Sequence, residues 1–174
     1  MTESEKREIL LELKKGHDAF IDALRGVDEP RARRQPGPGR WSILECVEHV
    51  GVAERTLLSR LTGAALSETP IGNPAREARI RKRAADRSTR VESPEAATPG
   101  GRFGSLREAI AFFDCVRGET IQFVEECSGD PRCLIASHPL IPGPVNAFEL
   151  LLLISVHPMR HAQQIEETRA ALPA

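Results

Sequence analysis

The chain has 174 residues, which is enough for one domain with a substantial hydrophobic core. Hydrophobic residues make up 40% and charged residues 28%, as in ordinary soluble globular proteins, and the formal net charge of −1 excludes a global field that favours nucleic acid or an anionic membrane. The longest apolar run, residues 150–154, is far too short to span a bilayer, and the acidic N-terminus does not resemble a signal peptide. We therefore expect one cytoplasmic domain over residues 1–174, without nucleic-acid or membrane partners.

Four helices and no convincing strand are expected, so the predicted fold class is all-α. The first helix spans about residues 3–25, where apolar residues recur at spacings of three and four: Ile9, Leu10, Leu13, Phe20, Ile21 and Leu24. Residues 31–40 contain alternating prolines and glycines and are predicted to form a loop.

The second helix has a clear start. Ser42 followed by Glu45 matches a capping box, and Trp41 before it can pack onto the first turn. The buried side is predicted to consist of Val47, Val50, Leu57, Leu58 and Leu61. Glu54 lies near the centre of that side, where a carboxylate is costly unless it has a partner.

A long connection follows at residues 67–104. Asn73 and Pro74 can begin a short helix that ends near Ala85. Five arginines lie between residues 76 and 87, and this basic stretch could contact phosphate. A solvated face is the favoured interpretation, because no aromatic residues interleave the arginines for base stacking.

The third helix is predicted from Ser105 to about Cys127, with a second capping box at its start, and the fourth from Asn146 to about Ala171. Residues 131–144 between them are predicted to be a loop. Helices of roughly 22 to 25 residues are about 35 Å long, which suits a four-helix bundle. The connection between the second and third helices is longer than an antiparallel hairpin needs, so we expect a long crossover, a parallel pair and an up-down-down-up order.

Three histidines are the candidate metal ligands. His157 and His161 are spaced i, i+4, which places both imidazoles on one side of a helix, and His49 can supply a third nitrogen from the second helix. Three neutral imidazoles suit Zn²⁺, Ni²⁺ or a similar borderline ion and leave a coordination position open for chemistry. Histidines also cap helices, pair with carboxylates or fill cores, and Pro158 predicts a kink or bulge beside His157.

Several other residues are candidates for supporting roles at such a site. Glu45 and Gln164 lie one turn from His49 and His161 and can orient their rings, although Glu45 is better explained by its capping box. Glu54 is either a base or the partner of an arginine, with Arg117 and Arg160 as candidates. Cys46 can add a soft ligand, but a small buried thiol is the favoured interpretation, and the four cysteines are expected to be reduced.

Four segments in order resemble the DinB-like (DinB/YfiT) superfamily of metal-dependent four-helix-bundle proteins. They are residues 41–50 (WSILECVEHV), Ser93-Pro94-Glu95 with Pro99-Gly100-Gly101, His138-Pro139 ahead of Gly143, and residues 157–166 (HPMRHAQQIE). The resemblance implies an up-down-down-up bundle, often dimeric, whose metal-binding histidines fall on His49, His157 and His161. It also implies, as one option, chemistry with a low-molecular-weight thiol such as mycothiol or bacillithiol.

Three functional hypotheses remain open from the sequence. The first is a metal-dependent enzyme, either a thiol-dependent S-transferase or a hydrolase, acting on a small-molecule substrate. The second is a bundle that binds a metal or small ligand without turnover. The third is a structural bundle whose histidines are polar core groups.

Overall fold

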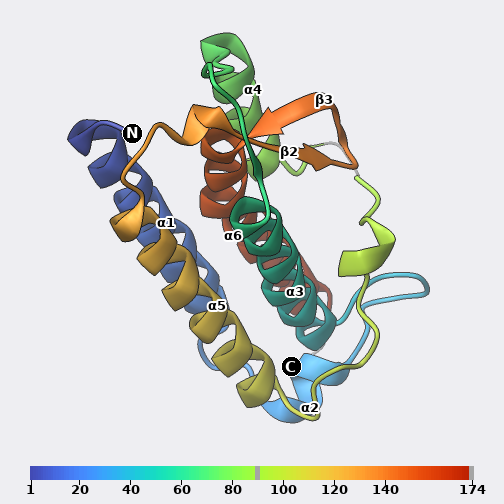
Figure 1. Ribbon diagram of the computed structural model, residues 1–174. Coiled ribbons are helices and arrows are strands. Elements are labelled where there is room, and N and C mark those ends of the chain that lie inside the picture. The colour runs from blue at the N-terminus through green and yellow to red at the C-terminus, as the bar shows by residue number, and fades with distance from the viewer. Residues whose placement is uncertain (89–90, 173–174) are drawn as a thin grey trace.

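The computed structural model describes residues 1–88 and 91–172. Four long helices form the bundle, and they lie close to the predicted bounds (Figure 1): α1 (Glu3–Ala23), α3 (Ile43–Thr62), α5 (Leu106–Glu126) and α6 (Ala147–Ala171). The short helix α4 (Pro74–Ala85) is also present where the sequence predicts it. Within the described ranges, no helix combines the length and apolarity needed to cross a bilayer.

The loop prediction for residues 31–40 is wrong at its beginning, because the short helix α2 (Glu29–Arg33) extends into it. The Asp28 side chain accepts a hydrogen bond from the Arg31 amide, and Pro30 lies in the first turn. Both features favour a helix start. The predicted loop was assigned from the downstream prolines and glycines, which begin only after this turn.

Contacts between helices define their directions. Gly51 of α3 lies against Phe112 of α5, and further along both helices Arg55 pairs with Glu119, so α3 and α5 run in the same direction. The α1 helix runs opposite to α5, because Lys6 contacts the Glu125 carbonyl. The segment between α3 and α5 therefore returns the chain to the other end of the bundle, as Figure 1 shows.

Helix starts follow the predicted capping chemistry in most cases. Complete capping boxes form at Ser42 with Glu45 and at Asn146 with Glu149. At Ser105 the side chain caps the helix, but the Glu108 carboxylate accepts from the Gly104 amide instead of closing a box. The starts of α3 and α6 are thus defined by local contacts, and these two helices carry the candidate histidines.

The expectation that the chain contains no strand is also wrong. A small antiparallel sheet has the order β1 (Ala65–Leu66), β2 (Leu134–His138) and β3 (Ile141–Asn146). Most of the predicted loop at 131–144 therefore belongs to a hairpin. Three prolines near β3 concealed the strand, and they are tolerated because β3 pairs only with β2 and so lies at an edge of the sheet.

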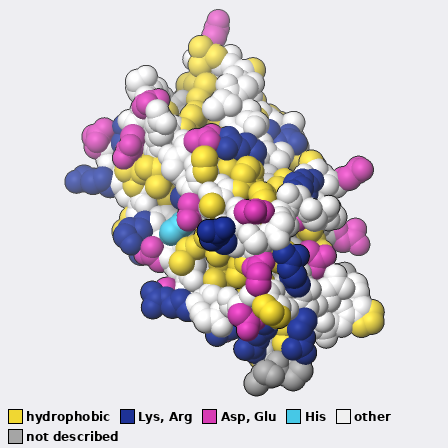
Figure 2. Space-filling model, turned by 90° about the horizontal axis from the view of Figure 1, so that it is seen from below, with side chains coloured by type: hydrophobic (Ala, Val, Ile, Leu, Met, Phe, Trp, Pro, Cys, Tyr) yellow, Lys and Arg dark blue, Asp and Glu magenta, His cyan; other side chains and the backbone are white. Residues whose placement is uncertain are grey.

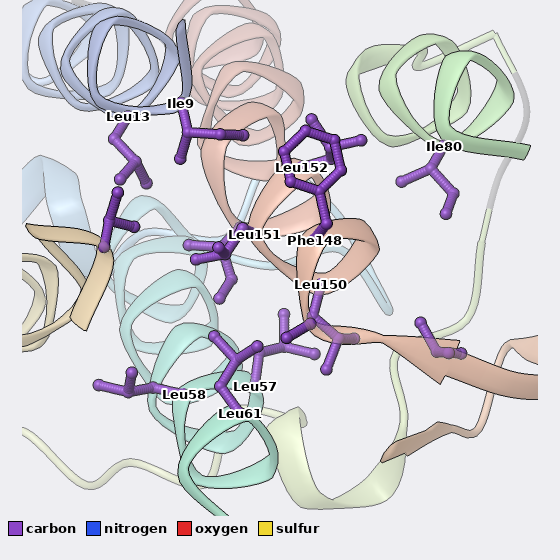
Figure 3. Close-up of a cluster of buried hydrophobic side chains, with 14 of the residues drawn as sticks. Ile9, Leu13, Leu57, Leu58, Leu61, Ile80, Phe148, Leu150, Leu151 and Leu152 are labelled. Atoms are coloured by element: carbon purple, nitrogen blue, oxygen red, sulfur yellow. The ribbon is translucent and has the colours of Figure 1, made fainter. Parts of the chain in front are cut away.

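Two clusters of buried hydrophobic side chains form the core. Figure 3 shows Leu150 and Leu151 of α6 facing Leu57 and Leu61 of α3, with Ile9 of α1 on the other side. The α6 helix packs against α1, α3 and α4, which explains why apolar residues surround much of its circumference. The central position of α6 brings its two histidines between neighbouring helices.

Candidate metal centre

The three candidate histidines converge on one point. His49 projects from α3 and His157 and His161 from α6, and one ring nitrogen of each lies within 4.8 Å of the others. The Nε2 atoms of His157 and His161 are 3.0 Å apart. Tetrahedral Zn²⁺ with ordinary Zn–N bonds places its nitrogen ligands about 3.3 Å from one another. The His157–His161 spacing is therefore close to that of a metal site, and the third nitrogen lies within 4.8 Å of both.

Hydrogen bonds orient two of the rings. The Nδ1 atom of His49 lies 2.8 Å from the Ala97 carbonyl oxygen, which can only accept. The Nδ1 atom of His161 lies 3.0 Å from Gln164 Oε1, and this oxygen also accepts from Arg87. Protons on both Nδ1 atoms leave the Nε2 lone pairs available for a metal, which is the usual arrangement of a second shell.

Trp41 covers one side of the cluster. Its ring centroid lies 4.8 Å from that of His49 and 6.4 Å from that of His161. The residue directly precedes the Ser42 cap, so the same local structure that begins α3 holds the indole over the histidines. An indole in this position restricts the motion of both rings and excludes water from that side.

The surroundings keep all three imidazoles neutral at neutral pH. Burial lowers the pKa of His49 below its ordinary value of 6.5. Burial also lowers the pKa values of His157 and His161 well below 6.5, and the repulsion that neighbouring histidines would exert on a proton adds to the effect. Neutral imidazole is the form that binds a metal ion, so these pKa shifts favour metal binding at neutral pH.

Glu48 is a supporting residue that sequence reasoning missed. Its buried carboxylate accepts hydrogen bonds from the Gly100, Gly101 and Arg102 amides and from the Arg102 guanidinium. Burial opposes ionisation, but these donors outweigh it and lower the pKa of Glu48. The carboxylate thereby anchors the loop whose Ala97 carbonyl orients His49. The adjacent glycines were the available clue, since Gly101 adopts a positive φ of 72°.

The other predicted candidates occupy different positions. Glu54 is buried and binds Arg117 and Thr120, and it does not line the cavity next to the histidines. Glu45 closes the Ser42 capping box and also contacts Gln35. Gln164 alone among these candidates reaches a histidine.

Cys46 does not join the histidine cluster. Its side chain is fully buried, and burial raises the pKa of its thiol to about 12. A thiol with this pKa is inert at neutral pH, so the structure supports the interpretation of a small buried side chain.

A cavity of about 1210 Å³ opens beside the three histidines. It lies among α3, α4, α6 and the β2–β3 hairpin, and its wall includes Arg160 and His138. Pockets of several hundred Å³ hold typical small-molecule ligands. The cluster is thus accessible to a substrate of substantial size.

Comparisons with known proteins are consistent with this architecture. A family model described as the DinB superfamily matches residues 12–165. YfiT from Bacillus subtilis, described as "a probable metal-dependent hydrolase with an unusual four-helix bundle topology", is similar with a TM-score of 0.61 and 14% identity, over 98% of this chain and 89% of that one. TT2238, described as a four-helix bundle protein, has a TM-score of 0.60 and 21% identity, and the match covers 93% of this chain and 98% of TT2238. None of the curated proteins matches the chain.

Proposed function

Because the chain belongs to the DinB superfamily, as its motifs indicate and the family model confirms, we propose that it is a metal-dependent enzyme. His49, His157 and His161 hold one divalent cation in this proposal, with Zn²⁺ or Ni²⁺ as the preferred ions. The description of YfiT as a probable metal-dependent hydrolase supports the same class of chemistry.

The convergence of three neutral imidazoles carries the proposal. Donors on three side chains lie within 4.8 Å of one another, and no carboxylate belongs to this cluster within the described residues. A site with only neutral ligands leaves the full charge of the cation available, and three protein ligands leave a position for substrate or water. A bound divalent cation supplies Lewis acidity, which lowers the pKa of a water or a small thiol near neutral pH.

The chain's own residues prepare the site for that chemistry. Ala97 and Gln164 hold two rings in the tautomer that presents Nε2, and Trp41 shields them from solvent. The neighbouring cavity admits a small-molecule substrate. Hydrolysis and thiol S-transfer both need a nucleophile that the cation activates, which is water in the first case and a thiol in the second.

Metal content and activity test the proposal in sequence. Protein purified without an affinity tag should contain about one equivalent of Zn²⁺ or Ni²⁺ by elemental analysis after dialysis. The loaded protein is then assayed for ester hydrolysis and for conjugation of electrophiles with several low-molecular-weight thiols. Absence of tightly bound metal refutes the proposal, whereas stoichiometric metal without either activity supports the alternative of a non-catalytic binding protein.

A further inference from the structure

One wall of the cavity is formed by a row of arginines on α4. Arg76, Arg79 and Arg83 are spaced three and four residues apart, so they share one face of the helix, and Arg87 follows just beyond its end. All four line the same cavity as the three histidines. Arg79 and Arg83 are exposed, as the solvated face favoured by the sequence implies, and this exposed face borders the cavity.

The four arginines differ in how they are neutralised. Arg76 binds the buried carboxylate of Glu149, and Arg87 binds Glu167 and Gln164. Arg79 and Arg83 are exposed, and the described part of the chain offers neither guanidinium group a hydrogen bond or an ion pair. Two guanidinium groups one turn apart are therefore available to a ligand in the cavity.

Few negative charges oppose them. Arg40, Arg60 and Arg160 also line the cavity, whereas Glu92 is the sole carboxylate among the lining residues that the structure describes. The chain as a whole carries a formal net charge of −1, and acidic and basic side chains are interspersed over the face in Figure 2. The positive charge is thus concentrated at the cavity, where it attracts anions.

Apolar side chains line the cavity together with the arginines and the histidines. Ile80 of α4, Leu57 of α3 and Leu153 of α6 all line the cavity. A ligand that is complementary to this part of the cavity has an anionic end and an apolar body. Guanidinium groups bind carboxylate and phosphate oxygens through paired N–H donors, and neighbouring side chains on a helix are close enough to share one such group.

We propose that Arg79 and Arg83 form an anion subsite that holds the carboxylate or phosphate group of an amphipathic small-molecule substrate. The reacting part of that substrate then lies toward His49, His157 and His161. This inference rests on the proposed function for the identity of the reacting end, but the anion subsite itself is independent of metal.

Titration calorimetry on protein freed of metal with a chelator, which is then removed by dialysis, tests the subsite. The probes are phenyl phosphate, phenylacetate and, as a neutral control of similar shape, 2-phenylethanol. At least one anion should bind at least about tenfold more tightly than the alcohol, and the tighter anion identifies the preferred group. Equal binding of all three probes, or no binding of either anion, overturns the proposal.

Matched variants separate the subsite from general charge. Arg79→Gln/Arg83→Gln should weaken the preferred anion at least about tenfold. Lys15→Gln/Lys82→Gln removes the same charge from exposed positions outside the cavity and should leave affinity within about twofold. Wild-type affinity in the arginine variant overturns the subsite. Elemental analysis of the arginine variant should still show full metal occupancy. Loss of the anion subsite is thereby distinguished from loss of the metal site.

Discussion

Arg117 donates a hydrogen bond of 3.4 Å to the backbone carbonyl oxygen of Ile154. This carbonyl lies four residues before Pro158, which has no N–H to offer it. The guanidinium thus satisfies a buried acceptor that the proline leaves open, and α6 continues through Pro158 from Ala147 to Ala171. The two candidate metal-binding histidines on either side of the proline therefore remain on one continuous helix.

Arg117 also neutralises the buried carboxylate of Glu54, at 2.7 Å. We predict that Arg117→Met lowers the free energy of unfolding by about 3–5 kcal/mol, because it leaves that carboxylate without a counter-charge. The double variant Glu54→Leu/Arg117→Met should be more stable than Arg117→Met alone. Urea denaturation measures both, with the exposed Arg107→Met as the control. Wild-type stability of Arg117→Met contradicts this account.

His157 and His161 should each be essential for tight metal binding. His157→Ala and His161→Ala each remove one of three nitrogen ligands, so dialysed protein should retain little metal by elemental analysis. His138→Ala is the matched control, since His138 lines the same cavity but lies outside the histidine cluster. Full occupancy in both ligand variants would refute the assignment.

Glu48 should act on the metal through His49. In Glu48→Gln the amide NH₂ group meets backbone donors, which loosens the loop that carries Ala97. We expect metal affinity to fall about 10- to 100-fold, as when other orienting partners of metal ligands are removed. Competition with a chelator of known affinity provides the measurement. Glu95→Gln, on an exposed side chain of the same segment, should bind metal like the wild type, and equal affinities for all three proteins count against a positioning role.

Gly16 lies where α1 approaches α6 closely. A Cβ atom added there would lie 2.1 Å from the Ser155 carbonyl oxygen, so the helices must separate to accept it. Gly16→Ala should destabilise the protein by about 1–3 kcal/mol in thermal or urea unfolding. Gly118→Ala meets no atom within 4 Å on α5 and should be neutral or stabilising by up to about 1 kcal/mol. Equal stabilities of the two variants would contradict a close contact between the helices at Gly16.

The stability of the metal-free protein should fall as the pH drops below 6.5. Burial lowers the pKa values of His49, His157 and His161 in the folded state, while the unfolded chain protonates them near 6.5. The unfolded state then binds more protons below pH 6.5, and above it both states are neutral. Each histidine can lower the free energy of unfolding by at most about 1.4 kcal/mol when the pH falls one unit below 6.5.

Urea unfolding at pH 7.5 and 5.5 measures this loss. The window avoids the carboxylates with lowered pKa values, including Glu48, because these titrate at more acidic pH. Burial raises the pKa of Glu54, which opposes the effect of the histidines, so the test is the difference between the wild type and a variant that keeps Glu54. A variant with glutamine at all three histidine positions should show a flatter dependence on pH. The same dependence on pH in the wild type and in this variant argues against neutral, buried imidazoles.

Local patterns in the sequence were sufficient for the main helices and for part of the site. Apolar spacing and capping residues predicted α1, α3, α5 and α6, because these signals act within one or two turns. The i, i+4 spacing placed His157 and His161 together for the same reason. The hairpin was missed, since edge position, which makes prolines tolerable in β3, depends on which strands pair.

The tertiary structure alone decided which distant groups meet. The packing of α3 against α6 brought His49 to the other two histidines, and it placed Glu54 beside Arg117 instead of in the cavity. The Ala97 carbonyl and the α4 arginines reached the site through the crossover segment. Such contacts depend on how far one helix is shifted and rotated against another. That relative placement is set by packing over the whole core, and no short stretch of sequence encodes it.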